Sequence, residues 1–375
     1  MIYFDNAATT PVHPEVAALF VKLLQEYGNP DSLHALGRKT SHLLDESRSR
    51  IANMLHVRKD EIIFTSCASE SNSMAIVGYA LANTKRGKRI ITSNAEHSSN
   101  QSAMKFLERM DFEVIYLPIH EDGQIHAQDV AKAMTDDTIL VSLIHVSNEM
   151  GAINDLSAIS DVVHQNPTCV FHGDCTQSFG KIDIPMDKLD MMTMSAHKIH
   201  GVKGSALLYK KFNIELQPLL FGGQQEQGLR GGTENAPTHI ALAKTIRLAL
   251  QEQEATQKKI KAIKDRLITR LQEIEGAKVL SPKDGADSIL CVCFEQMTSQ
   301  VLQNALDERG ICVSAISTCE SKHAGPNPVL INMGCTQKEA THNIRLSFSN
   351  QNTLKEADQF IDTVKEIIAA YGLPL

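Results

Sequence analysis

The chain has 375 residues, more than one ordinary hydrophobic core needs, so its length predicts two domains. Apolar residues make up 42% of it and charged residues 22%, which is typical of a globular protein and excludes a disordered or low-complexity chain. The formal net charge of -7 lacks the basic surface that a phosphate backbone requires, so we expect no nucleic acid partner.

The first residues, MIYFDNAATTP, carry Asp5 and lack the basic and apolar stretches of a signal peptide. No apolar run approaches the roughly 20 residues that span a bilayer, so we expect no membrane partner. The eight cysteines are dispersed without a C-x-x-C pair, which argues against a structural zinc site and predicts no metal. Reduced thiols in a chain without an export signal predict a cytoplasmic protein.

Helical periodicity predicts a first helix over residues 14–27, ended by Gly28-Asn29-Pro30, and a second over residues 37–55. Strands and helices then alternate. The predicted strands are residues 61–65, 89–92, 113–117, 139–145 and 169–173. The predicted helices are residues 69–82, 99–110, 127–134 and 156–164. Such alternation gives a largely parallel sheet with helices on both faces and ligands at the carboxyl ends of the strands.

A helical pattern longer than a typical helix follows over residues 236–275, and its polar stretch at residues 253–259 predicts a kink or a change of domain. The elements beyond it are shorter. The predicted strands there are residues 278–280, 288–294, 313–314 and 343–347. The predicted helices are residues 300–309, 336–341 and 354–371. These elements form a small second domain.

Three polar runs follow predicted strands of the alternating part. The run FTSCASESN leads into a helix whose first N–H groups, with Ser69, suit a phosphate, although plain N-capping by serines is the simpler interpretation. Asp174 ends an apolar strand, where a carboxylate pairs with a cation or a protonated ligand nitrogen, or else forms a helix cap or an Asx-turn. His97 is expected to face the cleft, although a histidine without other support is more often structural.

A fourth run, Ser195-Ala196-His197-Lys198, forms a predicted tight loop between two apolar stretches. Taken alone, it is more typical of a surface hairpin with a solvated lysine. Together with Ser69 and Asp174, however, Lys198 completes the parts needed to hold pyridoxal 5'-phosphate. The helix start binds the phosphate, Asp174 keeps the pyridine nitrogen protonated, and Lys198 forms the Schiff base.

The order of these motifs resembles the NifS/IscS-type cysteine desulfurases, which are fold-type I pyridoxal phosphate enzymes of the class V aminotransferase family. The resemblance covers nearly the whole chain. Its motifs are IYFDNAATTP at 2–11, GNP at 28–30, AEH at 95–97, HVSNEMG at 145–151, DCTQ at 174–177, SAHK at 195–198, RGGT at 230–233 and IRLS at 344–347.

The resemblance implies an α/β fold of the fold-type I transferases. A large domain would hold a mostly parallel seven-stranded sheet between helices, and a smaller C-terminal domain would be α+β. Residues 1–14 would pack with the small domain, residues 15–255 would form the large cofactor-binding domain, and residues 256–375 would form the small domain with the catalytic cysteine loop.

The resemblance also implies roles for individual residues. Lys198 would bind the cofactor covalently, Asp174 would pair with the pyridine nitrogen, and His97 would stack on the ring and act as acid or base toward the substrate thiol. Arg345 would bind the substrate carboxylate, with Asn29 close by. The other cofactor contacts would be Ala68, Ser69, Ser195 and His197 near the phosphate, Asn148 and Gln177 at the phenolic oxygen, and Thr233 from a neighbouring subunit. A residue acting across an interface implies a homodimer.

Cys319 stands 26 residues before Arg345, where this family carries its catalytic cysteine. The resemblance implies that Cys319 takes the sulfur of L-cysteine as a persulfide and that L-alanine is released. Residues 319–337 are expected to form a long loop, which resembles the group that delivers sulfur to a scaffold or acceptor protein of the IscU/SufU type or to a tRNA-thiolation enzyme. A thiolate must be the attacking species.

Three positions depart from the family pattern. Ile316 replaces the glycine of a usual Gly-Ser-Ala-Cys tetrad, Cys67 replaces a glycine beside the phosphate site, and Gln224 stands where a third glycine is common. Two other interpretations therefore remain open. The chain could be another fold-type I enzyme, such as a selenocysteine lyase, a β-lyase or an aminotransferase, or a weakly active paralogue that serves as a partner in sulfur or iron-sulfur cluster assembly.

Overall fold

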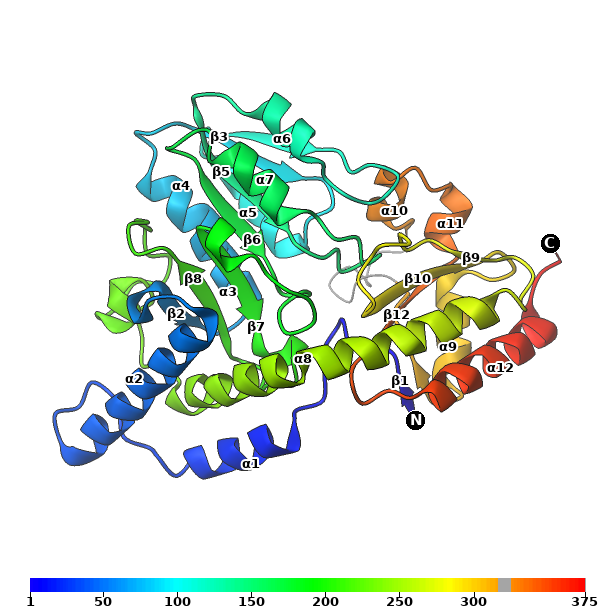
Figure 1. Ribbon diagram of the computed structural model, residues 1–375, viewed down its shortest axis with the longest axis horizontal. Helices are drawn as coiled ribbons and strands as arrows, with labels where there is room; N and C mark the ends of the chain where they lie inside the picture. Colours follow the sequence, from blue (N-terminus) through cyan, green and yellow to red (C-terminus); the bar gives the residue numbers. More distant parts are fainter. Residues whose placement is uncertain (316–324, 375) are drawn as a thin grey trace.

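The computed structural model describes residues 1–315 and 325–374. Its largest element is a seven-stranded sheet with the order β2-β8-β7-β6-β5-β3-β4 (Figure 1). In this order the strands are Ile62–Thr65, Ala206–Lys210, Met191–Ser195, Val170–Asp174, Thr138–Ile144, Arg89–Ser93 and Glu113–Leu117. Only β8 runs antiparallel to its neighbours in this sheet. The predicted fold class, a mostly parallel sheet of seven strands, is confirmed.

Helices cover both faces of this sheet because its strands are apolar on both sides. Alternate residues of one strand therefore enter different cores: Phe64 packs with α2 (Ala35–Leu55), α7 (Leu156–Val163) and the first half of α8 (Ala236–Leu271), whereas Ile63 packs against the opposite helices. That second group comprises α3 (Ala68–Ser73), a π-helical turn at Met74–Gly78, α4 (Tyr79–Ala82) and α5 (Ser98–Glu108). The helix predicted over residues 69–82 is thus interrupted by the π turn.

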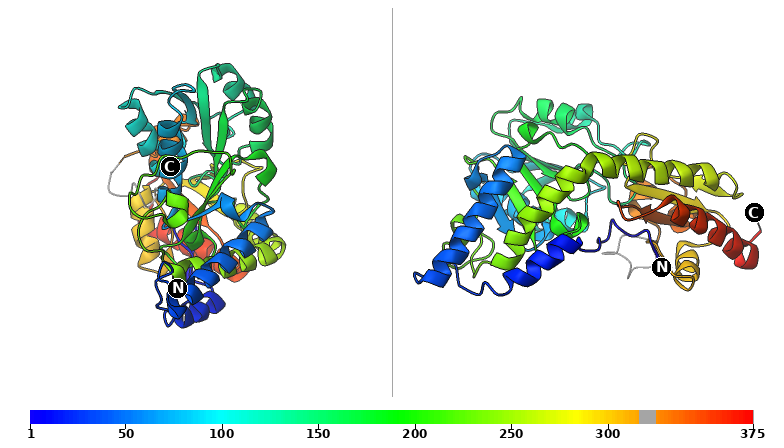
Figure 2. Two further views of the ribbon diagram at one scale, coloured as in Figure 1. Left: turned by 90° about the vertical axis from the view of Figure 1, so that its left-hand side faces the viewer. Right: turned by 60° about the horizontal axis from the view of Figure 1, so that its bottom comes forward.

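Helix α8 joins the two parts of the chain (Figure 2). Its early residues, such as Leu242, enter the core of the large sheet, and its later residues, such as Leu267, enter a separate core beside the small sheet. The helix continues through residues 253–259, where the sequence predicted a kink or a change of domain. The domain limits at residues 14 and 255 stay predictions.

The small sheet has the order β12-β10-β9 and is antiparallel. Its strands are Asn343–Ser347, Ile289–Phe294 and Ala277–Val279, and its core also receives α9 (Ser299–Asp307) and α12 (Leu354–Tyr371). The N-terminal strand β1 (Ile2–Tyr3) pairs in parallel with β11 (Ile311–Cys312). The first residues of the chain are thus anchored beside the small sheet.

Three predicted elements differ from the structure. Helix α1 (Pro14–Leu23) ends before residue 27, because the N–H groups of Gln25 and Glu26 turn back to carbonyls three residues earlier. A strand predicted at residues 313–314 instead lies at Ile311–Cys312, where the N-terminus supplies its partner. The loop predicted over residues 319–337 contains helix α10 (Pro328–Asn332), whose first N–H groups are capped by Asn327.

Two further short helices complete the fold: α6 (Ala127–Ala133), which follows the edge strand β4, and α11 (Gln337–Thr341), beside α10. Across the described ranges, the search for a helix that is both long enough and apolar enough to cross a membrane finds none.

Candidate active site

A pocket lies at the carboxyl ends of β5, β6 and β7, where a largely parallel sheet binds its ligands. It receives side chains from the large sheet, from β12 of the small sheet and from the N-terminal segment. Its lining residues are Ala7, Ala8, Cys67, Ala68, Ser69, His97, Ile144, Asn148, Asp174, Thr176, Gln177, His197, Lys198 and Arg345. Most of the residues predicted for the cofactor and the substrate therefore meet in one place.

Lys198 ends a 3₁₀ turn (Ala196–Lys198) that connects β7 to β8. Its Nζ donates hydrogen bonds to the carbonyls of Ala8, at 2.9 Å, and Ala7. The turn is therefore part of a hairpin, which is one of the two interpretations of the sequence. The amine of Lys198, however, points at the N-terminal segment inside the pocket. This contact excludes a freely solvated lysine.

Asp174 is the last residue of β6 and is 2% exposed. Its carboxylate accepts hydrogen bonds from Asn72 Nδ2 at 2.8 Å and from the N–H of Thr176 at 3.0 Å. The contact with Thr176 forms an Asx-turn, which is the structural role that the sequence offered as an alternative to ligand binding. The Asx-turn and a ligand-binding role are compatible, because Asp174 also lines the pocket.

His97 caps the start of α5, where its Nδ1 lies 2.8 Å from Ser99 Oγ. The preceding Glu96 is 3% exposed and accepts hydrogen bonds from Ser93, Asn100 and the N–H of Ile144. Burial raises the pKa of Glu96 to about 7. Glu96 thus ties the His97 turn to the end of β5, and its own ionisation opposes folding at neutral pH.

The proposed phosphate end of the pocket contains a neutral imidazole. Burial, followed by the charge of Lys198, lowers the pKa of His197 to about 4, and its Nδ1 lies 3.1 Å from Thr9 Oγ1. Ser195 Oγ is buried and has no hydrogen-bond partner among the described residues. Cys67 has a φ of -165°, which is extended backbone, so replacing a glycine with cysteine costs no strain here.

Arg345 reaches the pocket from β12 and is 4% exposed. Its Nη1 donates to the carbonyl of Asn148 at 2.7 Å, and its Nη2 lies 3.3 Å from Asp5 Oδ1. Its Nε is buried without a partner in the described part of the chain. A buried guanidinium with an unused donor suits an anionic group such as a carboxylate.

Sequence reasoning did not identify Lys181. Its Nζ donates to Gln177 Oε1 at 3.1 Å, and Gln177 Nε2 in turn donates to the carbonyl of Ala7, which Lys198 also contacts. Burial, followed by repulsion from Lys198 and Arg345, lowers the pKa of Lys181 to about 7. The GK pair in the stretch SFGKIDIP resembles a surface turn, so the sequence carried no signal of this position.

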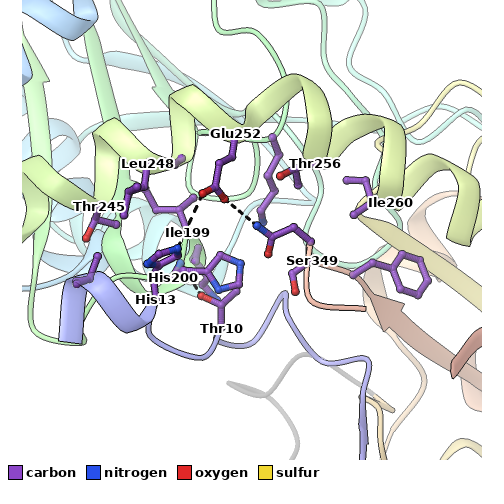
Figure 3. A pocket seen from close by; sticks show the side chains of 17 residues that line it. Thr10, His13, Ile199, His200, Thr245, Leu248, Glu252, Thr256, Ile260 and Ser349 are labelled. Carbon is purple, nitrogen blue, oxygen red and sulfur yellow. Dashed lines mark hydrogen bonds and ion pairs between the residues drawn. The ribbon is translucent and has the colours of Figure 1, made fainter. Parts of the chain in front are cut away.

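Lys181 and Lys198 also line a second cavity between the N-terminal segment, α8 and the residues after β12 (Figure 3). Glu252 of α8 lies 3.9 Å from His13 Nε2 and accepts a hydrogen bond from Asn350 at 2.9 Å. These contacts connect three separate parts of the chain next to Lys198. Lys181 therefore stands between the two cavities and contacts residues of the first.

Three of the predicted residues that the structure describes, Ser195, Asn29 and Thr233, do not line this pocket. Asn29 and Thr233 are exposed and line no part of it in the chain as described. Cys319 lies outside the described residues, as does Ile316. The roles of Asn29, Thr233 and Cys319 stay predictions.

The donor set fits pyridoxal 5'-phosphate. An amine, a buried carboxylate and an imidazole face one pocket, and the buried hydroxyls of Ser195 and Thr176 lack partners among the described residues. These are the groups that a phosphorylated pyridine aldehyde requires: a lysine for the aldehyde, an acid for the ring nitrogen and neutral donors for the phosphate.

Comparison with known proteins agrees with this chemistry. The Aminotransferase class-V family matches residues 2–360. A NifS/IcsS protein homolog of Lactobacillus delbrueckii subsp. bulgaricus is 40% identical over 98% of this chain and 97% of its own length. Cysteine desulfurase IscS 1 of Archaeoglobus fulgidus is 32% identical over the same shares of the two chains. The solved structure of a NifS-like protein superposes with a TM-score of 0.93 at 32% identity, covering 98% of this chain and 99% of that one.

The fold and the site thus define a class-V aminotransferase-type enzyme that depends on pyridoxal 5'-phosphate. Within that family the chain belongs to the NifS/IscS-type cysteine desulfurases. The family predicted from the sequence motifs is confirmed.

The raised pKa of Glu96 predicts a pH-dependent stability. The folded state holds a proton on Glu96 up to pH 7, whereas the unfolded state releases it near 4.5, so this residue lowers stability as pH rises between these values. We expect E96Q to gain up to about 3 kcal/mol in unfolding free energy relative to the parent at pH 8, but not at pH 4.5. Urea unfolding at both pH values measures this.

The exposed Glu254 provides the control, since E254Q should track the parent within about 0.5 kcal/mol at both pH values. An E96Q effect of equal size at pH 4.5 and pH 8 would contradict the assignment of a buried, protonated Glu96.

Lys181 predicts a shift in the titration of Lys198. Removing its charge with K181M should raise the pKa of the Lys198 nitrogen, because a like charge disfavours protonation. The pH dependence of the visible absorption of the bound cofactor measures this shift. K181R should restore the pKa of the parent. K203M, at an exposed position of the loop that carries Lys198, should change this pKa less than K181M does. An unchanged titration in K181M would exclude this electrostatic role.

Proposed function

We propose that this protein is an L-cysteine desulfurase that releases L-alanine and leaves the sulfur on Cys319 as a persulfide. The observation that supports it best is Arg345, a buried guanidinium that lines the same pocket as Lys198. An α-amino acid can offer its carboxylate to Arg345 while its amine approaches Lys198. Relatives named cysteine desulfurase, similar over nearly their whole length, favour cysteine as that amino acid.

The residues that hold the cofactor in this proposal are those of the pocket. Lys198 binds it covalently, Asp174 holds the proton of the pyridine nitrogen, and Asn148 and Gln177 contact the phenolic oxygen. When bound, pyridoxal phosphate supplies an electron sink for charge at the substrate Cα. The phosphate contacts are Ala68, Ser69, Ser195 and His197, with Thr233 from a second subunit.

The chain's own groups then move protons and sulfur. Arg345 orients the substrate by its carboxylate, Lys198 Nζ accepts the Cα proton, and His97 takes the proton of the substrate thiol. The Cys319 thiolate attacks the substrate sulfur. A sulfur–sulfur bond forms as the carbon–sulfur bond breaks, and the electron pair stays on Cβ. Protonation of Cβ and return of the Cα proton from Lys198 then give alanine.

The ends of the segment that carries Cys319 support this role. Ser314 exchanges two backbone hydrogen bonds with Arg345, at 3.2 and 2.7 Å. Beyond the segment, Asn327 Nδ2 donates to Glu149 Oε2 at 3.0 Å, and Glu149 follows Asn148 of the pocket. Five residues of extended chain span at most about 17 Å, so the position of Cys319 in the sequence is compatible with an attack at this pocket.

We further propose a homodimer whose interface contains Asn29 and Thr233. Exposed apolar side chains surround both residues: Tyr27 is 80% exposed, Leu33 89% and Phe221 79%. The two loops lie together, because Gln225 Nε2 donates to Asp31 Oδ2 at 2.5 Å. An apolar patch that also carries two predicted site residues fits a second copy of this chain.

The partners in this proposal are L-cysteine and a sulfur acceptor, either an IscU/SufU-type scaffold protein of iron-sulfur cluster assembly or a tRNA-thiolation enzyme. A cytoplasmic location belongs to the same proposal.

The persulfide role predicts a specific loss in C319S. We expect cysteine-dependent sulfide release under reductant to fall at least 100-fold while cofactor absorbance stays unchanged, because the attacking sulfur is gone. Mass spectrometry after incubation with cysteine should find one extra sulfur on the Cys319 peptide of the parent. C335S, at a partly buried cysteine outside the pocket, is the control and should retain activity.

Retained sulfide release in C319S would overturn the role of this cysteine. Formation of pyruvate and ammonia instead of alanine would favour a β-lyase, and a requirement for a keto acid would favour an aminotransferase.

The dimer proposal predicts that charge in the apolar patch separates the subunits. L33D and F221D should sediment as monomers and lose bound cofactor at least tenfold more readily, because Thr233 no longer reaches the neighbouring site. F212D, at an exposed phenylalanine outside the patch, should remain dimeric. Dimers that persist in both L33D and F221D would place the interface elsewhere.

A further inference from the structure

A cluster of histidine and aspartate side chains, which are residue types that can bind metals, lies on the surface, apart from the pocket. It follows the edge strand β4 and comprises His120 and Asp122 of a turn together with His126 and Asp129 at the start of α6. One ligand atom each of His120, His126 and Asp129 lies within 4.8 Å of the other two. The residues belong to a segment of ten, so the chain brings them together locally.

The side chains already interact in pairs. His120 Nε2 lies 2.6 Å from Asp129 Oδ2, and His126 Nε2 lies 2.9 Å from Asp122 Oδ2. The two imidazole rings stack with centroids 4.2 Å apart and an interplanar angle of 7°. Tetrahedral ligands on bonds near 2.1 Å are separated by about 3.4 Å, so shifts of roughly 1 Å bring these atoms to one ion.

The backbone of the turn holds this arrangement in place. The N–H of His120 donates to the carbonyl of Gln124 at 3.0 Å, and that of Gly123 donates back to His120 at 2.9 Å. Gly123 has a φ of +72°, and a Cβ there would meet Met150 at 2.6 Å, so only glycine suits this position. Ile125 is buried, and its N–H donates to Asn154 Oδ1 at 2.7 Å.

The ligand types select the ion. Two imidazoles with one or two carboxylates suit zinc and neighbouring divalent transition metals, whereas magnesium and calcium prefer oxygen ligands alone. One carboxylate oxygen each of Asp129 and Asp122 faces an imidazole nitrogen, and Lys132 Nζ lies 3.8 Å from Asp129 Oδ1.

The cluster is also accessible. The His120 and His126 side chains are each 42% exposed, so an ion can enter from solvent without opening the fold. A divalent ion that enters there can join the same four side chains.

We propose that His120, His126 and Asp129 bind one divalent transition-metal ion of the zinc type, with Asp122 as the fourth ligand. The ion links the turn after β4 to the first turn of α6. Through Ile125 and Gly123 it also stiffens the contact with residues 150–154, which follow Asn148 of the pocket. This inference is independent of the proposed reaction, since none of the four residues lines the pocket.

Titration calorimetry of the holoenzyme with Zn²⁺ tests this proposal. Cysteine thiols also bind zinc, so they are first blocked with N-ethylmaleimide. We expect one ion per chain near neutral pH, a weaker affinity at pH 5.5 as the histidines protonate, and at least a tenfold loss in H120A, H126A and D129N. H42A, at an exposed histidine paired with Glu46 by 3.5 Å, is the matched control and should bind as the parent does.

Hydrogen exchange of the unsubstituted holoenzyme gives a second test that needs no variant. Zinc should slow exchange of the backbone amides of residues 118–130 at least threefold more than elsewhere in the chain. Protection confined to another segment, or an H120A isotherm equal to that of the parent, would overturn the proposal.

Discussion

The site depends on the path of the first ten residues between the two sheets. Phe4 is fully buried in the small core, and its carbonyl accepts the N–H of Ser347 at 2.7 Å. From there Asp5 meets Arg345, the carbonyls of Ala7 and Ala8 receive Lys198, and the N–H of Thr10 donates to the carbonyl of His197. One short segment therefore fixes the position of Lys198 relative to Arg345.

Three basic side chains, Lys198, Lys181 and Arg345, meet at this junction, where Asp5 and Glu149 lie near the guanidinium. Burial and the charges of Lys198 and Arg345 lower the pKa of Lys181. Burial also keeps the nearby histidines neutral, with the pKa values of His197 and His172 near 4. The basic groups that line the pocket suit a ligand with negative charge, such as a phosphate or a carboxylate.

The sequence predicted the bounds of the secondary-structure elements best for strands with a strong apolar pattern. The strands at residues 113–117 and 343–347 agree with the structure at both ends, and Ser69, His97, Asp174 and Lys198 follow strands as expected. It missed the pairing of Ile2–Tyr3 with Ile311–Cys312, because two-residue strands carry no periodicity. It also missed Ala7 and Ala8, which act through backbone carbonyls that any residue supplies, and Lys181, whose burial depends on tertiary packing.

Arg345 connects the two halves of the proposed reaction. Its guanidinium faces the pocket, and its backbone exchanges hydrogen bonds with Ser314, five residues before Cys319. A substrate carboxylate that draws the guanidinium away from Asp5 and the Asn148 carbonyl acts on the same residue that anchors the cysteine segment. Asn327 anchors the other end through Glu149, which also lies 3.8 Å from Arg345 Nη1. In the proposed reaction, the residue that binds the substrate and the two ends of the segment that carries Cys319 would therefore belong to one buried cluster.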